Sequence, residues 1–163
     1  MIIIWVRHGT VDCNSKDADT LTPNGREFAK ALPDLLENNN IHPDVVFYDS
    51  SEKSKSGKPI TRCKETVAGL VGSADMIPYK FNDTDPIFEK CKQVEQTLIC
   101  YTSESLKYFP KIEGSDCAKH MGNKKLPNAP KTFTNKLYTY MIVSEYDGSV
   151  ITQISTIATG DGK

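Results

Sequence analysis

The chain has 163 residues, of which 38% are hydrophobic and 25% are charged. This length and composition exclude a disordered chain and fit one compact domain, which we expect to cover residues 1–163. With 20 basic and 21 acidic residues, the net charge of -1 gives no broad field for binding nucleic acid or an anionic membrane. Any anion-binding site must therefore be local.

The five cysteines are irregularly spaced and include no C-x-x-C pair, so they predict neither a metal site nor a disulfide framework. We interpret Cys63 and Cys100 as small core residues. The opening apolar run, MIIIWV, is too short to span a membrane, and no cleavage signal follows it. These features predict a cytoplasmic protein with reduced thiols.

The first predicted elements are a strand and a helix. Ile2 to Val6 is a continuous apolar, mostly β-branched run, which predicts a central strand buried on both faces. Thr22 and Pro23 fit the N-cap and first position of a helix whose apolar residues recur at helical spacing. Asn38 to Asn40 should end this helix, and Pro33 should kink or divide it.

A second strand and a second helix follow. Asp44 to Tyr48 predicts a short strand, after which residues 50–59 form a polar loop. From Ile60 to Val71 the apolar residues fall on one helical face, and Gly72 can end that helix. The order β-α-β-α is typical of an α/β domain.

The next segment repeats the alternation. Asp85 and Pro86 can start a short helix, and Thr97 to Tyr101 predicts a third buried strand. Ser103 is placed to cap a helix that Pro110 ends.

The last third of the chain has a different pattern. Gly114 to Pro130 predicts a long surface loop. Tyr138 to Ser144 and Ser149 to Ile157 are β-rich runs on either side of Asp147 and Gly148, which predicts a type I′ hairpin. We therefore expect an α/β domain with a mostly parallel central sheet, helices on both faces and a C-terminal β-hairpin.

The candidate chemistry begins at the end of the first strand, in the string WVRHGT. His8 directly follows Arg7 at the carboxyl edge of a buried strand, where ligands bind in open α/β sheets. Gly9 can supply the sharp turn that follows. This position favours a functional histidine over a structural one.

Three further strings follow in order: Asn14, LTPNG at Leu21 to Gly25, and RCKET at Arg62 to Thr66. Together with the RHG string, they resemble the histidine phosphatase superfamily, which includes cofactor-dependent phosphoglycerate mutases and many small phosphatases. The resemblance extends to about residue 70. It implies a phosphoglycerate mutase-like fold and hydrolysis of a phosphomonoester through a phosphohistidine on His8.

The residue types fit this chemistry. A transferring phosphoryl group spreads negative charge over its oxygens, and the guanidinium groups of Arg7 and Arg62 are permanent, fork-shaped cations that can bind it. Two flanking arginines also favour a neutral, nucleophilic imidazole at His8. We expect all three side chains to converge on one hollow that fits an oxyanion and is open to solvent. The predicted substrate-binding residues are Thr10, Asn14, Thr102 and Ser103, with no metal and no cofactor.

The sequence departs from the family on the other side of the site. Family members place a second histidine after a later apolar strand, whereas this chain has LICYTS, with Thr102 at that position. Losing one such preorganised donor typically costs about a hundredfold to a thousandfold in rate. An alternative function is therefore a catalytically impaired domain that binds phosphate or a phosphorylated partner.

Other roles stay open at this stage. Candidates for the acidic proton donor are Asp83, Asp85 and Glu89, and His120 could replace what Thr102 lacks if its loop folds over the pocket. His42 fits a surface residue. We favour hydrolysis over mutase activity because the stretch between Arg62 and the third strand leaves little room for a lid. The expected partner is a phosphorylated small molecule or a phosphoprotein, with no nucleic acid and no membrane.

Overall fold

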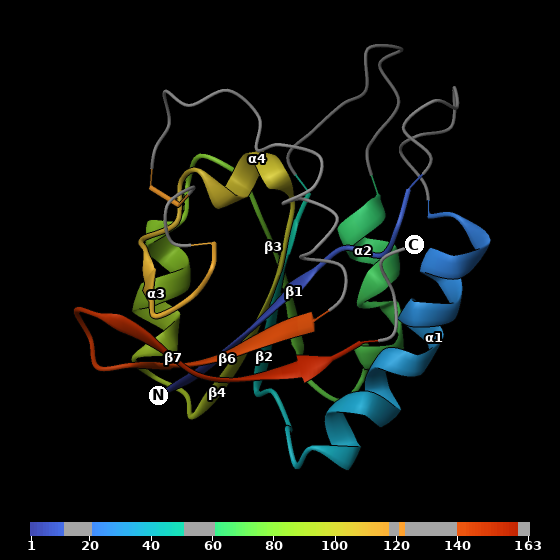
Figure 1. Ribbon diagram of the computed structural model, residues 1–163, viewed down its shortest axis with the longest axis horizontal. Helices are drawn as coiled ribbons and strands as arrows, with labels where there is room; N and C mark the ends of the chain where they lie inside the picture. Colours follow the sequence, from blue (N-terminus) through green and yellow to red (C-terminus); the bar gives the residue numbers. More distant parts are fainter. Residues whose placement is uncertain (12–20, 51–60, 118–120, 123–139, 160–163) are drawn as a thin grey trace.

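The computed structural model describes residues 1–11, 21–50, 61–117, 121–122 and 140–159. These residues form one seven-stranded sheet with helices on both faces (Figure 1), which confirms the predicted α/β fold class. No helix within the described ranges is long and apolar enough to cross a membrane. The strands are β1 (Ile2–Arg7), β2 (Val45–Asp49), β3 (Asp75–Tyr79), β4 (Gln96–Tyr101), β5 (Ile112–Glu113), β6 (Tyr140–Tyr146) and β7 (Ile151–Ala158).

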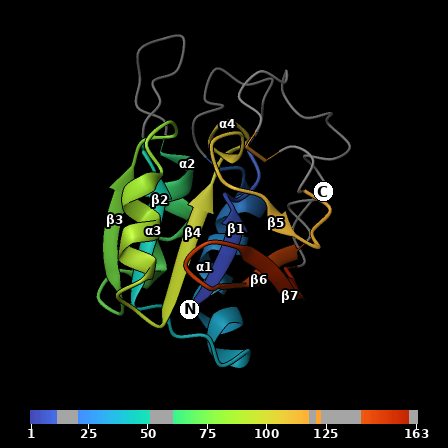
Figure 2. The same cartoon turned by 90° about the vertical axis from the view of Figure 1, so that its left-hand side faces the viewer.

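The order of the strands is β3-β2-β4-β1-β6-β7-β5. From β3 to β1 all neighbours are parallel, whereas β6 is antiparallel to both β1 and β7 (Figure 2). The carboxyl ends of β2, β4 and β1 therefore meet at one edge of the sheet, which is the usual ligand-binding edge of such folds.

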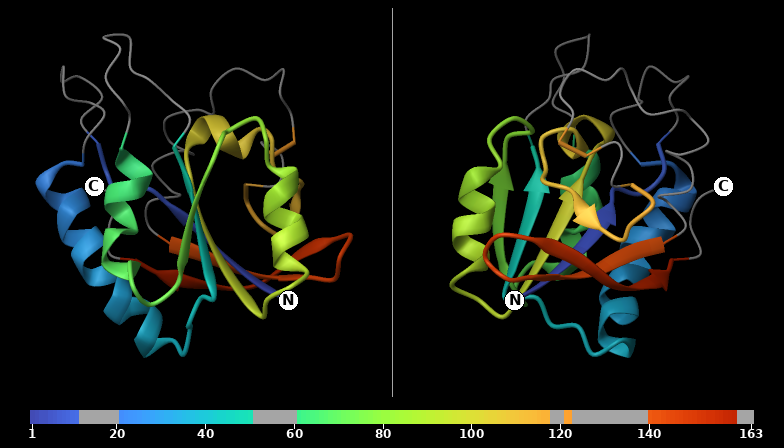
Figure 3. Two further views of the ribbon diagram at one scale, coloured as in Figure 1. Left: turned by 180° about the vertical axis from the view of Figure 1, so that it is seen from behind. Right: turned by 60° about the vertical axis from the view of Figure 1, so that its left-hand side comes forward.

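The helices lie in two layers. On one face are α1 (Pro23–Asn38), α2 (Arg62–Thr66) and a 3₁₀ turn over Ala68–Leu70, and on the other are α3 (Asp85–Cys91) and α4 (Ser103–Leu106). Figure 3 shows the sheet between α1 and α2 on one side and α3 on the other. Crossovers on both faces cover both sides of the parallel strands, which is why these strands are apolar throughout.

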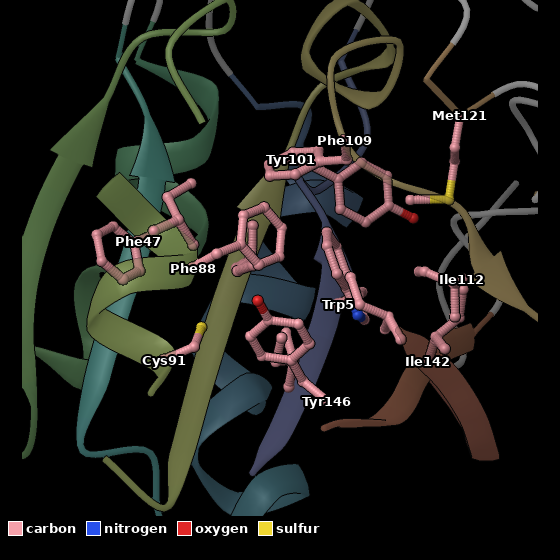
Figure 4. Close-up of a cluster of buried hydrophobic side chains, with 14 of the residues drawn as sticks. Trp5, Phe47, Phe88, Cys91, Tyr101, Phe109, Ile112, Met121, Ile142 and Tyr146 are labelled. Carbon is pink, nitrogen blue, oxygen red and sulfur yellow. The ribbon is translucent and has the colours of Figure 1, made fainter. Parts of the chain in front are cut away.

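The core is correspondingly divided in two. On the α3 side, the Trp5 ring packs edge-to-face against Phe109 at a centroid distance of 5.0 Å, and its Nε1 donates to Ser144 Oγ at 2.8 Å (Figure 4). Cys63 and Cys100 are both fully buried on the α1 side, so their predicted role as core residues is confirmed. Both cores lie directly beneath the carboxyl edge of the sheet.

Helix α1 begins and ends as predicted but is not divided at Pro33. A Cβ atom on Gly69 would lie only 2.9 Å from Cγ of Pro33, so the bare glycine makes room for the proline ring. The proline ring therefore lies between α1 and the 3₁₀ turn of the same layer.

The helix predicted over residues 60–71 is shorter than expected. Its α-helical part ends at Thr66, a 3₁₀ turn follows, and Val71 is 69% exposed rather than buried. Gly72 follows with φ of 91°, a left-handed conformation that suits glycine.

Strand β3 was not predicted, because Pro78 lies inside it. Proline cannot donate a ladder hydrogen bond, so it is confined to edge strands, and β3 is the edge strand beside β2.

Helix α4 is capped by Thr102 rather than by the predicted Ser103, and it ends at Leu106, before Pro110. The hydroxyl of Thr102 accepts the N–H of Ser105, so the residue after β4 also starts the helix.

The predicted C-terminal hairpin is confirmed as β6 and β7, but the predicted type I′ turn is wrong. That type needs two central residues with positive φ, and in this turn Gly148 alone has one. In its turn, Asp147 Oδ1 accepts the N–H groups of Ser149 and Val150, and Gly148 has φ of 100°. The aspartate side chain thus closes the turn together with the glycine.

Candidate active site

The candidate site lies where β1 and β4 end. Arg7 is in register with Tyr101, and the backbone N–H of His8 donates to the Tyr101 carbonyl at 3.3 Å. Thr102 is the next residue after Tyr101. The structure thus brings the RHG string beside Thr102.

The His8 ring has a defined tautomer. Nδ1 lies 2.7 Å from the Gly9 carbonyl oxygen, and because a carbonyl only accepts, Nδ1 carries the proton. The lone pair of the neutral ring is then on Nε2. A nitrogen lone pair is what a nucleophilic attack on phosphorus requires.

Burial is the largest cause that lowers the pKa of His8 well below 6.5, followed by the positive charges of Arg7 and Arg62. The bond to the Gly9 carbonyl acts in the opposite direction. The imidazole is therefore neutral near pH 7, and both guanidinium groups lie within electrostatic range of it.

Thr66 joins the turn that follows Arg7 and His8 to α2, the helix that carries Arg62. Its Oγ1 accepts the N–H of Gly9 at 2.8 Å and donates to the Arg62 carbonyl at 2.7 Å. The side chain is fully buried. This is the structural reason for the arginine and threonine of the RCKET string: the threonine fixes the helix that carries Arg62 to the residue after His8.

The LTPNG string supports the same turn from the other side. A Cβ atom on Gly25 would lie 2.4 Å from the Thr10 carbonyl oxygen, and one on Gly9 would lie 2.7 Å from the Gly25 oxygen. Thr22 caps α1 by accepting the Gly25 N–H at 3.1 Å, and its own N–H donates to the Thr10 carbonyl at 2.8 Å. Only glycine allows this close approach of the two backbones.

The opposite side of the site is a buried polar network. Thr102 Oγ1 donates to Oδ2 of Asp49 at 2.7 Å, and Asp49 is only 5% exposed. The Thr102 N–H donates to Ser105 Oγ at 2.9 Å, and the hydroxyl of Tyr79 also reaches Ser105 Oγ, at 3.2 Å. Burial, and then the charge of Asp49, raises the pKa of Tyr79 well above 10, so its hydroxyl stays protonated.

Four of the predicted site residues lie at or beside the end of β1: Arg7, His8, Thr10 and Arg62. Arg7 is 5% exposed and His8 has no exposed surface, whereas Arg62 is partly exposed although its Nε is buried. Within the described ranges that Nε has no hydrogen-bond partner. The hydroxyl of Thr10 lies 2.9 Å from that of Thr22.

The full burial of His8 departs from the expected solvent-open hollow.

The remaining predicted residues are scattered. Asn14 and His120 lie outside the described residues, and Ser103 is half-buried at the start of α4. His42 is exposed and lies 3.2 Å from a Glu37 carboxylate oxygen, as a surface residue would. Within the described part of the chain, no group of three or more His, Cys, Asp and Glu side chains could hold a metal ion.

The three acids considered as proton donors, Asp83, Asp85 and Glu89, are all exposed. Sequence reasoning missed Asp49. The signal was present, because Asp49 ends the apolar run VVFY and so stands at the carboxyl edge of a buried strand.

No family model matches the sequence, and no curated protein matches it either. Solved structures do match. The protein histidine phosphatase SixA, complexed with tungstate, superposes with a TM-score of 0.62 at 12% identity, covering 98% of both chains. The chain has the fold of the SixA phosphatases. This confirms the fold that the resemblance to histidine phosphatases implied.

Two further SixA structures agree. The SixA protein of Agrobacterium tumefaciens gives a TM-score of 0.57 at 15% identity, covering 96% of this chain and 97% of its own. That of Nakamurella multipartitia gives 0.54 at 14% identity, covering 95% and 94%. The SixA fold therefore extends over nearly the whole chain, well beyond the 70 or so residues that carry the sequence motifs.

Proposed function

We propose that this protein is a phosphatase that hydrolyses a phosphorylated substrate through a phosphohistidine on His8. The observation that carries the proposal is the neutral His8 ring, whose Nδ1 is held by the Gly9 carbonyl while Arg7 and Arg62 act on it electrostatically. The SixA fold supports the proposal, because such an imidazole then stands at the ligand-binding edge of a phosphatase fold.

The chemistry follows from these groups. Nε2 of His8 attacks phosphorus, the bond to the leaving group breaks, and water then hydrolyses the phosphohistidine. Arg7 and Arg62 bind the phosphoryl oxygens, where permanent forked cations are most effective. The Gly9 carbonyl stabilises the ring as it becomes positively charged, because it keeps accepting the Nδ1 proton.

The substrate classes are a phosphomonoester and, because one structural neighbour is a protein histidine phosphatase, a phosphohistidine side chain in a protein. We propose that Thr10, Asn14 and Ser103 contact the substrate. In the structure, the hydroxyl of Thr102 donates to Asp49, so this residue contributes through its position rather than as a direct donor to phosphate.

The test compares His8→Ala with His42→Ala on p-nitrophenyl phosphate. His42 is an exposed histidine and serves as the matched control. Removing the nucleophile should lower kcat at least about a thousandfold, whereas His42→Ala should match the wild type. Equal rates in the wild type and His8→Ala would refute the proposal.

A second candidate function is a domain that binds phosphate without turning it over. Two observations favour it: His8 has no exposed surface, and the hydroxyl of Thr102 is engaged by the Asp49 carboxylate. It predicts that tungstate raises Tm while turnover stays at the uncatalysed background. Turnover that depends on His8 would rule it out.

A further inference from the structure

Asp49 is the only carboxylate that is buried within the described part of the chain. It ends β2, whose Tyr48 pairs with Cys100, while Arg7 pairs with Tyr101 on the far side of β4. Asp49 and Arg7 therefore flank the end of β4 from opposite sides. Two strand spacings, about 10 Å, separate their backbones across the end of β4, so both residues lie at the same edge of the sheet.

Thr102 holds this carboxylate in place. A threonine hydroxyl has one proton, and the contact of 2.7 Å to Asp49 Oδ2 uses it. Its oxygen accepts the Ser105 N–H at 3.1 Å, which anchors the residue to α4. Thr102 is thus a positioning residue, and the group that it presents at the strand ends is the carboxylate of Asp49.

We infer that Asp49 is the acid–base residue of the site, an inference that rests on the proposed function. In the first step, Asp49 takes up a proton when the anionic substrate binds beside it, and gives that proton to the leaving-group oxygen as the P–O bond breaks and the bond from His8 Nε2 to phosphorus forms. In the second step, the Asp49 carboxylate takes a proton from water as water attacks phosphorus. The P–N bond then breaks, its electron pair returns to Nε2, and Asp49 is protonated again.

The three acids that the sequence offered as proton donors are worse placed. Asp83, Asp85 and Glu89 are exposed, and Glu89 lies 3.4 Å from the Lys92 ammonium group. A solvated carboxylate on a turn or helix surface has no fixed orientation toward a reacting oxygen, whereas Asp49 is fixed by Thr102 from within the protein. Geometry therefore favours Asp49.

The experiment measures Asp49→Asn on two substrates that differ in leaving group. An alkyl phosphate needs a proton on its departing oxygen, whereas p-nitrophenolate leaves without one. Asp49→Asn should lower kcat/KM for the alkyl phosphate by roughly a hundredfold or more, and change phosphoenzyme formation from p-nitrophenyl phosphate by less than about tenfold. Hydrolysis of the phosphoenzyme should slow, so labelled phosphohistidine should accumulate.

Asp85→Asn and Glu89→Gln are the matched controls and should behave as the wild type. An equal loss on both substrates, with no accumulated phosphoenzyme, would make Asp49 merely structural and overturn the inference. The inference would also be overturned if phosphoenzyme accumulated in a control variant and not in Asp49→Asn. If the wild type forms no phosphoenzyme at all, the proposed function fails and the inference with it; if it does and Asp49→Asn changes neither step, only the inference fails.

A second pair of variants covers the case in which Asp49→Asn does not fold. Thr102→Val removes the bond to Asp49 but leaves the carboxylate, and it should slow phosphoenzyme hydrolysis about tenfold. Thr102→Ser keeps the hydroxyl and should restore the rate. Failure of serine to rescue, or no effect of valine, would contradict the positioning role.

Discussion

At the end of β1, two arginines act on a neutral imidazole, whereas across β4 a threonine hydroxyl meets a buried carboxylate. We call the first group, Arg7, His8 and Arg62, the cationic side, and the second, Asp49 and Thr102, the acidic side. The cationic side can bind an anion and supply a nucleophile. The acidic side has the groups for moving a proton.

The two sides also differ in how they are held. Close backbone packing holds the cationic side, where Gly9 lies against Gly25, and one bond from the Gly9 N–H to the Thr66 hydroxyl supports it. Side-chain bonds fix the acidic side, through the hydroxyls of Thr102 and Ser105. Backbone contacts require particular residue types at fixed spacings, and this is why one side is visible as sequence motifs and the other is not.

The largest expected effect concerns the arginines of the cationic side, which should be needed for activity. Replacing Arg62 with Ala removes a permanent cation from the cationic side, and we expect kcat/KM to fall by about a hundredfold to a thousandfold. Lys64→Ala, an exposed cation on the same helix, is the control and should have little effect. Steady-state kinetics on p-nitrophenyl phosphate would measure both, and equal rates would mean that Arg62 does not contact phosphate.

Because backbone contacts support the cationic side, a side chain added at Gly25 should lower stability. In Gly25→Ala the new Cβ would lie 2.4 Å from the Thr10 carbonyl oxygen, so the backbone must shift. We expect unfolding free energy to fall by about 1–3 kcal/mol in urea denaturation. Lys30→Ala, exposed on the same helix, should stay within about 0.5 kcal/mol. An unchanged midpoint for Gly25→Ala would mean that this close approach is absent.

Thr66 tests whether the two cationic elements depend on each other. Thr66→Val leaves the buried Gly9 N–H without its acceptor and releases the Arg62 carbonyl, so we expect a stability loss of about 1–3 kcal/mol. Phosphatase activity should fall by about tenfold and return in Thr66→Ser. Full activity of Thr66→Val would mean that the RHG turn and the helix that carries Arg62 do not depend on each other.

The lowered pKa of His8 predicts the smallest effect, on pH-dependent stability. Between about pH 6.5 and the lower pKa of the folded state, the unfolded chain binds a proton that the folded chain does not, so stability falls as pH falls. The slope is at most about 1.4 kcal/mol per pH unit. Denaturation at pH 7.5 and 5.5 should therefore show a larger acid loss in the wild type than in His8→Asn. Equal losses would mean that the ring is not held neutral.

The sequence predicted most of the fold, because buried parallel strands and amphipathic helices leave clear apolar patterns. It failed where tertiary contacts decide: β3 contains Pro78 but is an edge strand, and α1 continues through Pro33, whose ring packs against Gly69. Of the candidate site that we propose, Arg7, His8 and Arg62 were suggested by motifs. Asp49 was not, since only the fold brings the ends of β2 and β4 together and shows Thr102 bound to that carboxylate.

The most direct test of the central claim is a crystal structure of the protein with tungstate or orthovanadate. We predict one anion at the carboxyl edge of the sheet, in contact with Nε2 of His8 and with the guanidinium groups of both Arg7 and Arg62. An anion bound elsewhere, or a His8 ring that stays fully enclosed with Arg62 directed away from it, would contradict the account.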